Sequence, residues 1–222
     1  MKTKLLYLSA LFILATFTVQ AQMDFGILGG VNFQNLNGKD FFGNKLENDM
    51  IIGYHAGVNV QIRVAPEFYF QPGLLLSTKG AKNVSGSSTT TTKLTYVELP
   101  LNMVYKGKLG NGFVMVGFGP YLGFGVGGKV IYESGNSEIE TKITFQNVVE
   151  SGDDLLTPYY KRFDAGGNIF AGYEMAGGLF FQLNAQLGMI KINPEDKRAE
   201  PIYSDESSVK NTGFGLSLGY RF

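Results

Sequence analysis

The chain has 222 residues, of which 19 are Lys or Arg and 19 are Asp or Glu, so its formal net charge at pH 7 is zero. That balance argues against nucleic acid as a partner, because binding to nucleic acid depends on an excess of basic side chains. The sequence contains no cysteine, which excludes disulfides, thiol catalysis, cysteine-ligated metals and a lipid-modified N-terminal cysteine.

The first residues predict a cleaved signal peptide. Lys2 and Lys4 precede an apolar run from Leu5 to Val19, and Val19-Gln20-Ala21 supplies the small residues that signal peptidase needs. A membrane anchor is the alternative, but roughly 15 apolar residues fall short of the roughly 20 that span a bilayer. We therefore expect a signal peptide at residues 1–21, removed after Ala21, and one β-barrel domain over residues 22–222.

Eight later segments alternate apolar residues with small or polar ones at a period of two, which is the pattern of a β-strand. In chain order they cover residues 24–34, 52–63, 67–77, 97–106, 114–127, 163–174, 179–189 and 213–222. Pro72 and Pro100 interrupt the third and fourth segments, and each predicts a bulge or a weakly paired position because proline donates no ladder hydrogen bond. The small face of the fifth segment is mostly glycine, which is typical of a narrow, strongly curved barrel.

The connections between these segments alternate in length. Long ones cover residues 36–50, 80–92, 128–160 and 193–210, and short ones cover 64–66, 107–112 and 175–177. Long loops at one rim and tight turns at the other are typical of an outer-membrane barrel with both chain ends on the periplasmic side. A soluble lipocalin-like barrel is the alternative, and alternation alone does not distinguish the two.

The composition of the two faces of these strands favours a membrane barrel over a soluble one. One face holds glycines, amides and charges and is too polar for a soluble core, whereas the other is almost uniformly Val, Leu, Ile and Phe. Aromatic residues such as Tyr54, Tyr105 and Tyr220 gather toward strand ends, where an aromatic girdle lies. We therefore predict an all-β fold, an eight-stranded antiparallel transmembrane β-barrel with up-and-down topology, embedded in outer-membrane lipid.

Four stretches also carry a family resemblance. They are the Val-Gln-Ala-Gln end of the signal peptide, Tyr96-Val97-Glu98-Leu99-Pro100-Leu101, the strand from Phe163 to Glu174, and the C-terminal Gly215–Phe222. In these stretches the chain resembles the PorT-like outer-membrane β-barrel proteins of Bacteroidetes. The resemblance implies the barrel and, through the terminal Phe222, assembly by the outer-membrane insertion machinery. It implies no activity, although the namesake is linked to protein secretion.

Two motifs resemble functional sites, but we interpret both as structural. Gly123–Lys129 matches G-x-x-x-x-G-K, yet Val130 replaces the Ser or Thr that would bind magnesium, and the glycines continue a strand. His55 is the only histidine, and beside Ser217 or a lumen carboxylate it would be a candidate general base. No second catalytic motif supports that hypothesis, so we expect no enzymatic activity, no metal site and no cofactor.

The remaining candidate functional residues are charged side chains that different strands direct into the lumen. Buried charges need partners, so we expect an ion-pair and hydrogen-bond network that fills the lumen. Its predicted members are Asp24, His55, Arg63, Glu67, Glu98, Asp164, Glu174 and Arg221. The alternative is a narrow porin-like path for ions or solutes.

From these predictions we expect a non-enzymatic outer-membrane barrel whose long extracellular loops bind a protein partner or another surface. The runner-up is an accessory component of a secretion or transport assembly, and a third hypothesis is an enzyme with its site in the lumen. The other expected partners are outer-membrane lipid and, during assembly, the insertion machinery.

Overall fold

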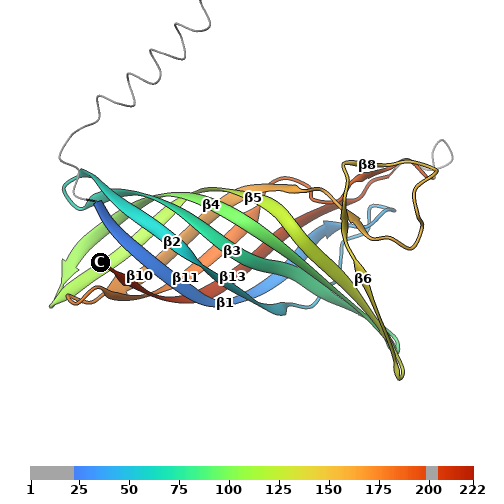
Figure 1. Cartoon of the computed structure of the whole chain (residues 1–222), viewed down its shortest axis with the longest axis horizontal. Helices are drawn as coiled ribbons and strands as arrows, with labels where there is room; N and C mark the ends of the chain where they lie inside the picture. Colours follow the sequence, from blue (N-terminus) through green and yellow to red (C-terminus); the bar gives the residue numbers. More distant parts are fainter. Residues whose placement is uncertain (1–22, 199–204) are drawn as a thin grey trace, which may run out of the picture.

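Eight long strands close into a barrel. The structure, a computed structural model, describes residues 23–198 and 205–222. The long strands are β1 (Met23–Lys39), β2 (Ile51–Ala65), β3 (Phe68–Ser85), β4 (Ser88–Leu109), β5 (Gly112–Ser134), β10 (Phe163–Glu174), β11 (Leu179–Gly188) and β13 (Ser208–Arg221). They pair antiparallel in this order, and β13 pairs with β1 to close the ring (Figure 1). The predicted eight-stranded antiparallel barrel is confirmed.

The two ends of the barrel differ. One end, named here the turn end, holds the C-terminus and the tight connections at residues 66–67, 110–111 and 175–178 (Figure 1). The opposite end, named here the loop end, holds the longer connections and the short strands β6 (Ser137–Lys142), β7 (Thr144–Phe145), β8 (Val148–Val149), β9 (Tyr159–Tyr160) and β12 (Glu195–Asp196). The sequence predicted this asymmetry.

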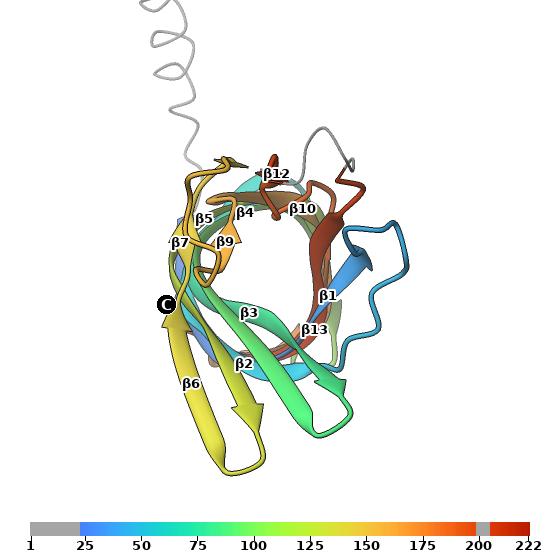
Figure 2. The same cartoon turned by 90° about the vertical axis from the view of Figure 1, so that its right-hand side faces the viewer.

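Two of the predicted long loops are largely strand. Residues 80–92 form the top of a β3–β4 hairpin with Ser85 opposite Ser88, and β5 runs on to Ser134 before pairing back with β6. The expectation of loops there was wrong because threonine and other β-branched residues at 89–92 and 130–131 favour extended backbone even beyond the rim. As a result, β3, β4, β5 and β6 form one sheet that projects past the ring on one side (Figure 2).

The outer and inner surfaces of the barrel follow the predicted alternation. Large apolar side chains cover the outside, with Tyr54 at 66% and Phe118 at 64% exposure, as a surface meant for lipid requires. Glycine makes room on the inside: a side chain at Gly117 would overlap the Phe170 ring, and one at Gly219 would overlap Phe180. These contacts explain the glycine-rich inner face of β5, where bulky residues from other strands fill the space.

One part of the inner surface is less polar than the sequence indicates. Leu28, Val104, Met115, Phe170 and Phe180 are buried together inside the barrel. Each comes from a different strand, so period-two alternation within single segments does not reveal that they meet.

The described residues contain no helix long and apolar enough to cross a membrane. The predicted signal peptide, residues 1–21, lies outside the described residues.

Candidate functional site

The barrel interior holds buried polar and charged side chains that contact one another in three levels along the barrel axis. Nearest the turn end is a cluster of Lys106, Glu174 and Arg221, named here the turn-end cluster. Glu174 accepts from Lys106 Nζ at 2.6 Å and from Arg221 Nε at 2.9 Å, and all three side chains are at most 8% exposed. Arg221 also donates to Asn59 Oδ1 at 2.9 Å. One carboxylate therefore balances two cations, and neutral amide oxygens accept the remaining donors.

The middle level is a belt of neutral side chains around His55. Its Nδ1 lies 2.7 Å from Asn32 Oδ1, and its Nε2 lies 2.7 Å from Ser217 Oγ. Because an amide oxygen only accepts, Nδ1 carries the proton and Nε2 accepts from the Ser217 hydroxyl. Asn184 Nδ2 donates to the same Ser217 oxygen at 3.2 Å, so this hydroxyl is held on both sides.

The third level, named here the loop-end cluster, contains Lys79 between Glu98 and Asp164. Lys79 Nζ lies 2.6 Å from Glu98 Oε1 and 3.2 Å from Asp164 Oδ2. It also lies 4.1 Å from the centre of the Tyr121 ring, a cation–π contact. Asp164 Oδ2 accepts further from Tyr121 Oη and from Asn211 Nδ2. Here one cation balances two carboxylates, the reverse of the turn-end cluster.

An apolar cap covers the loop-end cluster. Ile143 and Ile192, from the loops, are buried against the strand residues Leu36, Leu94 and Val130. Phe145 of β7 and Tyr160 of β9 pack on the same group, and Figure 2 shows both short strands at the loop-end mouth of the ring. Apolar contact thus holds the loops over the buried charges and keeps water away from them.

The space that remains inside the barrel is small. A cavity of about 50 Å³ lies in the middle level, lined among others by Asn32, His55, Glu98 and Ser217. At roughly 10–15 Å³ per water position, it has room for a few water molecules. Asn32, His55 and Ser217 have the connectivity of a catalytic triad, but a cavity of about 50 Å³ is too small for an organic substrate. We therefore interpret His55 as a buried polar residue satisfied by its neighbours.

Five of the eight predicted network residues take part in these levels: His55, Glu98, Asp164, Glu174 and Arg221. The prediction was wrong for Arg63 and Glu67, which are exposed at the turn end. Arg63 keeps the inward register but lies beyond the last buried layer, and Glu67 sits in the β2–β3 turn at φ 64°. Asp24 is half-buried near the same rim and forms no ion pair within the described part of the chain.

Sequence reasoning did not place Lys79 or Lys106 in the network. Lys79 lies just before a stretch predicted as a loop, although its spacing of two from Ser77 continues the inward face. Lys106 falls on the polar face of its segment, two residues after Val104 and within the predicted strand. The period-two alternation of this segment could therefore have assigned Lys106 to the inner face of the barrel.

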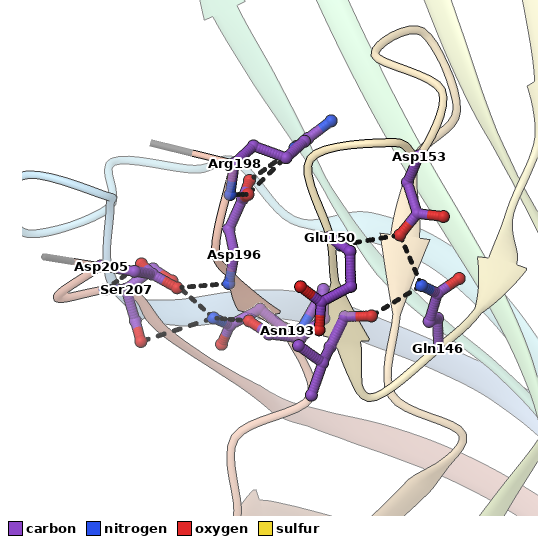
Figure 3. A network of polar contacts seen from close by, with 10 residues as sticks. Gln146, Glu150, Asp153, Asn193, Asp196, Arg198, Asp205 and Ser207 are labelled. Atoms are coloured by element: carbon purple, nitrogen blue, oxygen red, sulfur yellow. Dashed lines mark hydrogen bonds and ion pairs between the residues drawn. The ribbon is translucent and has the colours of Figure 1, made fainter. Parts of the chain in front are cut away.

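A second polar network joins the loops above the cap, and Figure 3 shows it. Asp153 accepts from Gln146 Nε2 at 2.6 Å and from the Glu150 backbone N–H at 2.8 Å. Asn193 donates to Ser207 Oγ at 2.6 Å and accepts from the Val209 backbone N–H at 2.8 Å. The parallel pairing of β8 with β12 connects the two groups.

Charged groups in these loops are held in fixed geometry. Arg198 binds Asp196 through both guanidinium Nε and Nη2, the latter at 2.6 Å, and these hydrogen bonds lower the pKa of the Asp196 carboxyl. The backbone N–H of Leu156 and the Thr157 hydroxyl donate to Asp154 and lower its pKa. Within the described ranges no group of three or more His, Asp or Glu side chains is placed to hold a metal ion.

Comparison with known proteins identifies the family. Residues 20–193 match the family described as outer membrane protein beta-barrel domain. The chain belongs to this family. It is an outer-membrane β-barrel protein.

Solved structures of other small barrels are similar in fold. Neisserial surface protein A is 10% identical over 90% of this chain and 97% of its own, with a TM-score of 0.43. Ail, the attachment invasion locus protein of Yersinia pestis, in complex with the heparin analogue sucrose octasulfate, is 15% identical over 90% and 99%, with a TM-score of 0.41. No curated protein matches the chain.

Proposed function

We propose that this outer-membrane barrel is closed to solutes and binds a partner through an apolar tip in its loops. In the proposed orientation the turn end faces the periplasm and the loop end faces the outside of the cell, as the asymmetry of connection lengths favours. The barrel then serves as a rigid base, and binding takes place on the loops that it positions.

The observation that carries the proposal is the tip formed by Leu155 and Leu156. These side chains are 78% and 82% exposed, which makes them the most exposed large apolar residues in the described chain. Adjacent exposed leucines outside the membrane belt gain free energy when a partner covers them, at about 25 cal/mol per Å² of apolar surface.

The backbone around this tip is fixed by polar contacts. Asp154 accepts from the Leu156 backbone N–H at 3.0 Å and from Thr157 Oγ1 at 2.8 Å, directly across the tip. Asp153 ties the base of the same loop to Gln146 and to the Glu150 backbone. A tip held in place before binding loses less conformational entropy when it binds, which favours a recognition role.

The three levels of buried side chains support the closed-lumen part of the proposal. They leave about 50 Å³ between them, and the apolar cap covers the loop-end mouth. A narrow porin-like path would need a continuous polar passage through the barrel. The buried apolar residues Leu36, Leu94 and Ile192 of the cap interrupt such a passage at the loop end.

A capture experiment tests the loop-binding proposal. Wild-type barrel and a Leu155→Ser/Leu156→Ser variant are purified in detergent and used to capture proteins from outer-membrane and external fractions. Leu109→Ser is the matched control, since Leu109 is 58% exposed but lies at the turn end. We expect a partner retained by wild type and Leu109→Ser and lost by the double variant. Identical capture by all three proteins would contradict the proposal.

The same experiment addresses the secretion hypothesis. The narrower resemblance to PorT-like barrels, carried by Tyr96–Leu101, makes an accessory role in a secretion assembly the competing proposal. Capture of secretion components that is unaffected by the tip substitutions would favour that role over binding through the loop tip.

A further inference from the structure

Three lysines form a row across the outer surface of the projecting sheet. Lys93 of β4 lies directly opposite Lys129 of β5, and Lys129 lies directly opposite Lys142 of β6. The neighbouring residues Leu94 and Val130 are buried in the apolar cap, so period-two alternation directs the lysines to the outside.

Such a row is unfavourable without a counter-charge. Like charges directly opposite each other destabilise an antiparallel pair, and here the repulsion occurs twice in succession. Glu140, which pairs opposite Ile131, offsets one charge through a 2.6 Å ion pair with Lys129. That pair is 40% and 47% exposed, so solvent screens it, and Lys93 and Lys142 form no ion pair within the described residues.

The lysines surround a hollow. An open cleft of about 450 Å³ is lined by the three lysines, by Thr78, Thr95, Gly127, Gly128 and Ile143, and by Glu140, the carboxylate that pairs with Lys129. A register shift at Thr95 and Tyr96 bends the sheet at this level, and the space that a side chain at Gly127 would occupy is empty. The cleft therefore combines three ammonium groups and two hydroxyl donors, against one carboxylate, with room for a ligand group.

The cleft lies at the edge of the apolar belt. Toward the turn end on the same strands, Leu76, Phe124 and Val126 face outward with exposures of 51–53%. Arg162 adds a positive charge at this boundary, with its guanidinium 5.3 Å from the centre of the Phe124 ring. A ligand in the cleft thus meets cations on one side and a lipid-facing apolar surface on the other.

We propose that Lys93, Lys129 and Lys142 bind the phosphate of an anionic lipid in the leaflet at the loop end. The ammonium groups neutralise the phosphate, Thr78 and Thr95 supply hydroxyl donors, and the acyl chains lie along the apolar belt below. This association supplies the counter-charge that the lysine row lacks. It differs from the loop-tip function in both location and ligand.

Lipid binding by purified full-length barrel tests the proposal. The probes are diphosphorylated lipid A, the same lipid A after removal of its phosphates, and inorganic phosphate. We expect wild type to bind the phosphorylated lipid, and the triple variant Lys93→Gln/Lys129→Gln/Lys142→Gln to bind it at least about tenfold more weakly. The control triple Lys45→Gln/Lys108→Gln/Lys197→Gln removes the same charge from exposed lysines elsewhere and should bind like wild type.

The other probes decide whether lipid phosphate is the ligand. Equal binding of dephosphorylated lipid A would overturn the role of phosphate, and full competition by inorganic phosphate at matched concentration would overturn the role of lipid. Equal weakening by both triple variants would show a general charge effect and would also overturn the site. Heat-dependent gel mobility of each variant verifies that the barrel is folded, so that a loss of binding reports on the cleft.

Discussion

Arg221 and Arg63 show how strongly depth within the barrel decides what one residue contributes. Both occupy inward register positions near the turn end, but Arg221 is buried against Glu174, Asn59 and Gln71, whereas Arg63 is exposed at the rim. Removing one member of a buried ion pair leaves its partner without compensation, which costs far more than removing a solvated charge.

We therefore expect Arg221→Ala to lower the free energy of unfolding by on the order of 3 kcal/mol, and Arg63→Ala to change it by less than about 0.5 kcal/mol. The measurement is the urea midpoint at which the compact, unheated gel species disappears. Equal midpoints for the two variants would show that the turn-end cluster contributes no more than a surface charge.

Residue-level prediction from the sequence succeeded where alternation was regular and failed near strand ends. The period-two pattern placed Glu98, Asp164 and Glu174 on the inner face, and they lie there in contact with cations. It could not separate Arg63 from Arg221, because period reports direction but not distance from the rim. Lys79 was missed because β3 extends to Ser85, well past its predicted end.

Among the elements, β13 closes the barrel, and the predicted assembly signal Phe222 directly follows its last residue. Phe222 is 72% exposed, its backbone N–H donates to Phe25 O at 2.8 Å, and its ring meets Tyr220 edge-on at 5.1 Å. The folded protein thus packs few of its own side chains against this ring, so deletion of Phe222 removes little packing within the barrel.

Deletion of Phe222 should slow insertion and lead to accumulation in the periplasm, with little change in the unfolding midpoint of the barrel that does insert. Pulse-labelling followed by membrane fractionation measures the rate, and Phe222→Tyr is the control that keeps an aromatic end. Unchanged membrane yield after deletion would argue against an assembly signal.

The loop elements depend on a few buried polar anchors. Asn193 is 9% exposed and anchors its loop to the start of β13. Its side chain accepts a hydrogen bond of 2.8 Å from the Val209 backbone and donates one of 2.6 Å to Ser207 Oγ. Removing a buried hydrogen-bonding side chain of this kind costs about 1–3 kcal/mol of stability. The loss destabilises the loop and not the barrel, because the hydrogen bonds between the barrel strands do not involve the Asn193 side chain.

We expect Asn193→Ala to increase the rate of proteolysis within the loop at residues 189–207 several-fold, without change in the heat-dependent mobility of the barrel. Limited proteolysis of protein in detergent makes the comparison, with Asn37→Ala as a loop-end control. A coincident loss of the barrel species would mean that loops and barrel unfold as one unit, contrary to this expectation.

At the scale of the whole molecule, the lumen charges balance only when the levels are taken together. The turn-end cluster has two cations and one carboxylate, and the loop-end cluster has one cation and two carboxylates. Three positive and three negative side chains thus sum to zero, which limits the cost of burying them inside a membrane protein. The opposed imbalances lie on either side of the neutral belt around His55.

This series of levels determines what permeability experiments should show. An eight-stranded barrel is only wide enough for side chains to fill, and any ion crossing this one must pass both charged clusters and the apolar cap. Wild type should therefore give no stable conductance steps in planar bilayers.

Arg221→Ala alone should also stay closed, because the loop-end cluster and the cap are intact. The double variant Lys79→Ala/Arg221→Ala disrupts both clusters and should produce small, flickering steps. Arg63→Ala is the control and should match wild type. Large, stable steps from the unmodified protein would refute a closed lumen and would move the function from the loop tip to the pore.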